Sequence, residues 1–96
     1  MKTIPALLVL SSASSAFAIS NAGLIEACKT EGVRQVVEQA AAYGCSADPR
    51  TVQVSEIDNR FYNPSKYIWF TGKAHCGAQG VQDISKMVQY YQGRCF

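Results

Sequence analysis

The 96-residue sequence has one histidine, three prolines and no run of apolar residues long enough to cross a membrane. A membrane-spanning helix needs about 20 mostly apolar residues in succession. The nine Lys and Arg residues are scattered along the chain, whereas proteins that bind nucleic acid through its phosphates cluster them. We therefore expect no transmembrane segment and no nucleic-acid partner.

Catalytic and metal-binding motifs are also missing. Structural zinc sites use four Cys or His ligands, but no C-x-x-C pair occurs and His75 is the only histidine. No Gly-rich phosphate loop and no Gly-x-Ser-x-Gly elbow is present. We therefore predict no cofactor, no metal and no enzyme activity. A secreted ribonuclease is the enzymatic alternative, with His75 as the general base assisted by Glu56 and Arg60.

The first 18 residues have the pattern of an export signal. Lys2 supplies a positive charge, residues 4–10 are mostly apolar, and Ala16 and Ala18 form the A-x-A pattern that signal peptidase reads. We therefore predict that residues 1–18 are a signal peptide and that residues 19–96 form a single secreted domain. Once Lys2 is removed, eight of the nine basic residues remain beside seven acidic ones, so the net charge is close to +1.

The predicted domain contains all four cysteines of the chain: Cys28, Cys45, Cys76 and Cys95. An even number of cysteines in a small secreted domain is typical of a disulfide framework. A domain of this size buries little surface on folding, and each disulfide adds roughly 2–4 kcal/mol of stability. We therefore expect two disulfides.

Apolar spacing predicts a helix over residues 32–43. Its apolar positions recur at helical intervals, and Gly44 follows as a typical stop. These positions are Val33, Val36, Val37, Ala40 and Ala41. A second helix is predicted over residues 81–91, where Val81, Ile84, Val88 and Tyr91 follow the same interval.

Three strands are predicted around these helices. Residues 24–28 are short and apolar, residues 51–58 begin with an alternation of apolar and polar side chains, and residues 66–74 contain an aromatic, β-favouring run. The expected order is strand, helix, strand, strand, helix, with a possible short final strand. This order predicts an α+β fold, a small α/β sandwich with the helices on one face of a sheet.

The predicted fold also predicts which cysteines bond. If each element reverses the direction of the previous one, Cys28 and Cys95 meet at one end of the domain, and Cys45 and Cys76 meet at the other. A Cys28–Cys45 bond would instead have to span a helix, far beyond the roughly 7 Å allowed between α-carbons.

Two segments resemble a known family. The Ala-rich helix that ends in Tyr43-Gly44-Cys45, and Cys76 followed by residues 81–91 and Cys95, are similar to small secreted effectors of plant-associated fungi. The closest resemblance is to the α/β group named for the viral killer toxins of smut fungi. It implies a secreted α/β sandwich, although the killer toxins carry more cysteines than this chain.

A second resemblance implies a different fold. Tyr43-Gly44-Cys45, Cys76-Gly77 and the ending Gly93-Arg94-Cys95 are similar to the Avr-and-ToxB-like β-sandwich effectors. That family implies Cys28–Cys76 and Cys45–Cys95 disulfides and strands in place of helices. The helical spacing over residues 32–43 favours the killer-toxin-like group.

The segment before the aromatic strand is the best candidate for binding a partner. It mixes aromatic and basic side chains, which are enriched where proteins bind one another. The candidate partner-binding residues are Arg60, Phe61, Tyr62, Lys66 and Tyr67. We expect a secreted fungal effector that binds a host protein, or alternatively an antimicrobial or killer-type toxin with a target on microbial cell surfaces.

Overall fold

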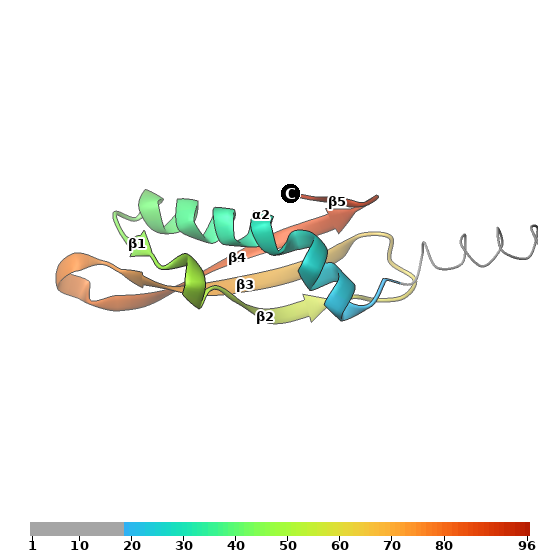
Figure 1. The fold of residues 1–96 in the computed structure, drawn as a ribbon, viewed down its shortest axis with the longest axis horizontal. Coiled ribbons are helices and arrows are strands. Elements are labelled where there is room, and N and C mark those ends of the chain that lie inside the picture. The colour runs from blue at the N-terminus through green and yellow to red at the C-terminus, as the bar shows by residue number, and fades with distance from the viewer. Residues whose placement is uncertain (1–18) are drawn as a thin grey trace, which may run out of the picture.

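The computed structural model describes residues 19–96, so the predicted signal peptide, residues 1–18, lies outside the described part. The described residues form one long α-helix, five β-strands and two short 3-10 helices (Figure 1). In chain order these elements are α2 (Asn21–Ala42), β1 (Ser46–Ala47), η1 (Pro49–Thr51), β2 (Gln53–Asp58), β3 (Lys66–His75), η2 (Gly77–Gln79), β4 (Val81–Tyr91) and β5 (Arg94–Cys95).

The sheet is antiparallel and built around β3. One edge of β3 pairs with β1 and β2, the other edge pairs with β4 along its whole length, and β5 pairs with the end of β4. The helix α2 crosses one face of this curled sheet (Figure 1). The fold therefore belongs to the predicted α+β class, with one helix in place of the expected two.

The predicted first strand, residues 24–28, is wrong, because this segment belongs to α2. The helix begins after Ser20, whose hydroxyl accepts a hydrogen bond from Gly23 N (3.0 Å). Its buried positions recur every four residues along the helix, and they are Leu24, Cys28, Gly32, Val36 and Ala40. The stripe therefore extends further towards the N-terminus than the apolar run at residues 33–41 indicates, because Gly32 and Cys28 continue it.

The predicted second helix, residues 81–91, is also wrong, because this segment is the strand β4. Ile84 and Val88 are buried and four residues apart, and this spacing fits one face of a helix and one face of a strand equally well. Pairing with β3 along ten residues decides between the two. The predicted strands at residues 51–58 and 66–74 are confirmed as β2 and β3, and the possible final strand is confirmed as β5.

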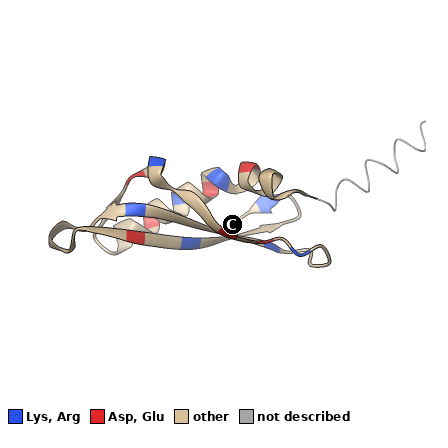
Figure 2. Cartoon of the chain, turned by 90° about the horizontal axis from the view of Figure 1, so that it is seen from below, with Lys and Arg blue, Asp and Glu red and all other residues tan. Residues whose placement is uncertain are grey.

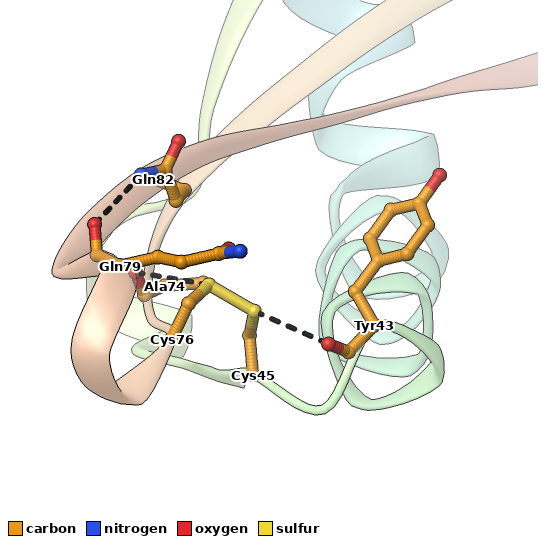
Figure 3. Close-up of a disulfide and its surroundings, with 6 residues drawn as sticks. All are labelled: Tyr43, Cys45, Ala74, Cys76, Gln79 and Gln82. Carbon is orange, nitrogen blue, oxygen red and sulfur yellow. Dashed lines mark hydrogen bonds between the residues drawn. A yellow bond between two sulfur atoms is a disulfide. The ribbon is translucent and has the colours of Figure 1, made fainter.

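Two disulfides connect the helix region to the strands. Cys28 bonds Cys95, and Cys45 bonds Cys76. Figure 3 shows the second bond joining the turn after α2 to the turn before β4, with the Tyr43 ring pointing away from it. This pairing is the one that the reversing arrangement implies. A strand at residues 81–91 returns the chain to the same end of the domain as a helix would, so the error in that element leaves the pairing unchanged.

Charged residues of both signs are interspersed over the molecule, and Figure 2 shows red and blue segments on the helix and the sheet with no large block of one colour. Several of these residues pair with one another at the surface. Lys73 Nζ lies 2.6 Å from Asp83 Oδ1, and Arg34 forms ion pairs with both Glu31 and Glu38. The described chain therefore presents no concentrated basic or acidic surface, and its candidate binding sites have to be sought in shape and exposed apolar groups.

Candidate functional site

The loop between β2 and β3, residues 59–65, is tied down at its base. Asn59 Nδ2 donates to Ile19 O (3.0 Å) and to Asn21 Oδ1 (2.9 Å), which joins the start of the loop to the start of α2. Asn63 N donates to Arg60 O (3.1 Å), which closes a turn in the middle. The loop is therefore held in shape by its own polar groups.

Two large aromatic side chains project from this loop into solvent. Phe61 is 84% exposed and Tyr62 is 78% exposed, the highest values of any large apolar side chain in the described residues. Exposing two adjacent aromatic rings leaves a large apolar area in contact with water. Such rings are typical anchors for a partner molecule because they are rigid and gain much from burial.

Lys66, the first residue of β3, is tied to the same loop. The residue is only 5% exposed, and its ammonium group donates a hydrogen bond to the carbonyl of Arg60 in the loop. No carboxylate of residues 19–96 lies within ion-pair distance of Lys66 Nζ. A buried ammonium group normally has an anionic partner. The Lys66 ammonium lacks one among these residues, so it can still donate hydrogen bonds to an acceptor on a partner molecule.

The loop and the turn between β4 and β5 border a hollow of about 340 Å³. Lys66 lines it from β3, and Tyr90, which pairs with Lys66 in the sheet, lines it from β4. The complete lining is Ile19, Phe61, Tyr62, Asn63, Pro64, Lys66, Tyr90, Tyr91, Gln92 and Gly93. We call this the aromatic hollow, since four of its lining side chains are aromatic.

The five predicted partner-binding residues do not all lie together. Phe61, Tyr62 and Lys66 line the aromatic hollow. The guanidinium of Arg60 instead pairs with Asp58 (3.1 Å), and only its carbonyl is tied to Lys66. Tyr67 follows Lys66 in a strand, so its side chain points to the opposite face of the sheet.

Sequence reasoning missed the part of the hollow that β4 and the turn after it supply. Assigning residues 81–91 to a helix hid the pairing with β3 that places Tyr90 beside Lys66. A signal for a strand at residues 81–91 is the hairpin turn that follows it, Gln92-Gly93, whose φ angles are 51° and 78°. Two residues with positive φ between strands form the tight turn that favours glycine at its second position.

A second, more polar hollow of about 430 Å³ lies beside the first turn of α2 and is lined mainly by β2 and the residues after it, including Glu56, Asp58 and Arg60. Asp58 and Arg60 pair with each other there. These two charges satisfy each other, and the hollow has no exposed aromatic ring. It is therefore the weaker candidate for a binding site.

The three residues considered for a ribonuclease, His75, Glu56 and Arg60, do not lie close together. His75 is the last residue of β3, whereas Glu56 pairs with Trp69 six positions earlier in the same strand. Strands rise about 3.3 Å per residue, so His75 and Glu56 lie roughly 20 Å apart. Arg60 lies further along, beyond the end of β2. These three side chains cannot act on one phosphate group.

The described part of the chain contains no helix that is long and apolar enough to cross a membrane. No protein-family model, curated protein or solved structure matches this chain. Among the described residues, the aromatic hollow is the site that best fits the binding of a partner.

Proposed function

We propose that this protein is a secreted fungal effector that acts without catalysis, by binding a host protein in the aromatic hollow. The observation that carries the proposal is that a buried Lys66 and two exposed aromatic rings, Phe61 and Tyr62, line the same hollow. The β2–β3 loop and the end of β4, which border the hollow, lie at the end of the domain opposite the turn between β3 and β4 (Figure 1), and Cys76 of the Cys45–Cys76 disulfide lies in that turn.

The chemistry of the hollow indicates what part of a partner it takes. The Lys66 ammonium has three N–H donors, and the loop carbonyl of Arg60 is its one acceptor among the described residues. A carboxylate accepts charge-assisted hydrogen bonds, which are stronger than neutral ones. The partner group is therefore an acidic side chain or a C-terminal carboxylate, with apolar neighbours that cover Phe61 and Tyr62.

The anchored loop makes such binding efficient. Binding is weakened by the free energy needed to order loops and side chains. Here Asn59 already fixes the base of the loop, the Arg60 carbonyl is held from both sides, and Phe61 and Tyr62 have few torsion angles to restrict. A partner would therefore meet a surface close to its bound form.

The disulfides and the signal-like segment support secretion. Disulfides persist mainly in oxidising, extracellular compartments, and the two in this chain use all four cysteines. The resemblance to killer-toxin-like effectors supports a role directed at a host organism.

The experiment is affinity capture from plant extract with matched variants. The bait is residues 19–96 with both disulfides formed, either unchanged or as the double variant Phe61→Ala/Tyr62→Ala. The control bait is Tyr43→Ala, which removes a 66% exposed aromatic ring at the other end of α2. Circular dichroism of all three baits checks that each is folded.

We expect one host protein to be captured by the unchanged and Tyr43→Ala baits and to be lost with the double variant. Identical captured proteins for all three baits would contradict the proposal. Growth inhibition of competing fungi that depends on Phe61 and Tyr62, with no capture from plant extract, would replace the host partner with a microbial one.

A further inference from the structure

The outer edge of β4 has no partner strand over most of its length within the described residues. The inner edge pairs with β3 without interruption. On the outer edge, β5 pairs only with Tyr90 and Tyr91, and Phe96 exchanges two backbone hydrogen bonds with Gln89 (2.8 and 3.0 Å). Residues 81–88 are left with a free edge, which is a template for another strand.

The backbone groups along this free edge belong to alternate residues. Both backbone groups of Gln89 point outward, since they bond Phe96. Successive residues of a paired strand direct these groups to opposite sides, and the register of β4 has no bulge. The outward N–H and C=O groups therefore belong to Val81, Asp83, Ser85 and Met87.

We propose that this edge pairs with the same edge of a second copy of the chain. The two strands run antiparallel around a two-fold axis at Ile84, so the sheets of the two copies become one. Val81 then lies opposite Met87 of the second copy, and Asp83 lies opposite Ser85 of the second copy. This register places all four outward residues opposite one another, and all their backbone groups are hydrogen-bonded.

Charge favours this register over its neighbours. Asp83 faces a serine in it, and its carboxylate is already paired with Lys73 Nζ at 2.6 Å. Lys86 faces Gln82 of the second copy. A shift of two residues one way would place Asp83 against Asp83 of the second copy, and like charges opposite each other destabilise a sheet.

A shift of two residues the other way is blocked at the end of the strand. It would place Val81 of the second copy opposite Gln89, whose backbone groups already bond Phe96. The register centred on Ile84 stops two residues short of Gln89 and so leaves β5 in place. The free segment of one chain thus matches the free segment of the other in length.

The helix α2 packs on one face of both β3 and β4, whereas the proposed contact uses the backbone groups at the outer edge of β4. Gly72 of β3 pairs with Ile84, and Val36 of α2 packs on Gly72, with Val36 Cγ1 only 3.0 Å from the position of a Cβ there. At the level of the two-fold axis α2 therefore lies over β3 as well as β4, and the free N–H and C=O groups of β4 point away from β3 in the plane of the sheet. Because both copies use the same edge, the assembly closes at two chains.

The outer-face pair of Val81 and Met87 gives a test specific to this register. Both side chains are exposed, at 55% and 40%, so charged residues there leave the single chain folded. In Val81→Lys/Met87→Lys, two introduced lysines oppose each other twice across the dimer. In Val81→Lys/Met87→Glu, each introduced lysine faces an introduced glutamate of the second copy. Within one chain these positions are about 20 Å apart.

The measurement is sedimentation velocity of residues 19–96 from micromolar to millimolar concentration. We expect the unchanged chain to form dimers as its concentration rises, the lysine/lysine variant to stay monomeric, and the lysine/glutamate variant to dimerise with sensitivity to salt. A monomeric unchanged chain at every concentration would overturn the proposal and leave the edge to a peptide of another protein. Dimerisation of the lysine/lysine variant equal to that of the unchanged chain would also overturn it.

Discussion

Gly32 of α2 lies directly over the ring of Phe70 on β3. A Cβ atom built on Gly32 would be 2.4 Å from Phe70 Cδ2, closer than any real contact of that kind. Phe70 is itself 1% exposed and central to the core. The absence of a side chain at Gly32 thus sets how closely the helix approaches the sheet.

We predict that Gly32→Ala destabilises the domain by about 1–3 kcal/mol, the usual effect of overpacking a core. In an unobstructed helix the same change would stabilise by up to about 1 kcal/mol, so the sign tests the contact. Chemical denaturation measures the free energy of unfolding. In a Phe70→Leu background the penalty should shrink, and an undiminished penalty there would show that the contact with Phe70 is not its cause.

The Gly32 contact also illustrates what a sequence pattern leaves undecided. Helical spacing in residues 32–43 predicts the middle of α2, but the buried Gly32 and Cys28 carry little apolar signal of their own. The four-residue spacing of Ile84 and Val88 fits both a helix and a strand, and only the pairing of this segment with β3 makes it a strand. The exposed Phe61 and Tyr62 follow from loop composition, whereas Tyr90 joins them only through the long-range β3–β4 register.

The two disulfides should contribute unequally to stability. Cys28 and Cys95 are 67 residues apart, and Cys45 and Cys76 are 31 residues apart. If a disulfide stabilises by restricting the unfolded chain, the bond that closes the longer loop stabilises more. Each bond should contribute about 4 kcal/mol to the free energy of unfolding, and the Cys28–Cys95 bond should contribute about 0.7 kcal/mol more than the other.

The test compares paired Cys→Ser variants at each bond by urea denaturation. We expect the Cys28→Ser/Cys95→Ser variant to be the less stable of the two. Peptide mapping without reduction should recover Cys28 linked to Cys95 and Cys45 linked to Cys76. Recovery of Cys28 linked to Cys76 would support the β-sandwich alternative and refute the fold described above.

Lys66→Met should separate binding from stability. Methionine replaces the buried ammonium with an apolar group of similar length, which removes a desolvated charge while retaining packing. The expected change in the free energy of unfolding is within about 1 kcal/mol, whereas binding of an acidic group in the aromatic hollow should be lost. Lys73→Met, which removes a surface ammonium paired with Asp83, is the matched control and should keep binding.

Acid should remove a small part of the stability through Glu31. Hydrogen bonds from Arg34 and Gln35 lower the pKa of Glu31 below its usual value. Because the pKa of Glu31 is lower in the folded state than in the unfolded state, the ionised carboxylate stabilises the fold at pH values above its unfolded-state pKa. This stabilisation is lost as the pH falls through the folded-state pKa. Because the ion pairs lie at the surface, the effect should be about 0.5 kcal/mol.

The check is the free energy of unfolding of the unchanged chain and of Glu31→Gln between pH 7 and pH 2. The variant should be the less stable at pH 7, and the difference should vanish towards pH 2 and in 1 M salt. Glu26→Gln, at an exposed position of the same helix, is the control. A difference for Glu31→Gln that stays constant across this pH range would exclude the charge as its cause.

The aromatic hollow is proposed to bind an acidic group that has apolar neighbours. The most direct test of this binding is an NMR titration of residues 19–96 with a capped Leu-Glu-Leu peptide and, separately, with the matched Leu-Gln-Leu peptide. We predict that the glutamate peptide shifts the side-chain signals of Lys66 and the ring signals of Tyr62 and Tyr90, and that the glutamine peptide shifts them at least severalfold less. Equal shifts from both peptides, or shifts confined to residues outside the hollow, would contradict the claim.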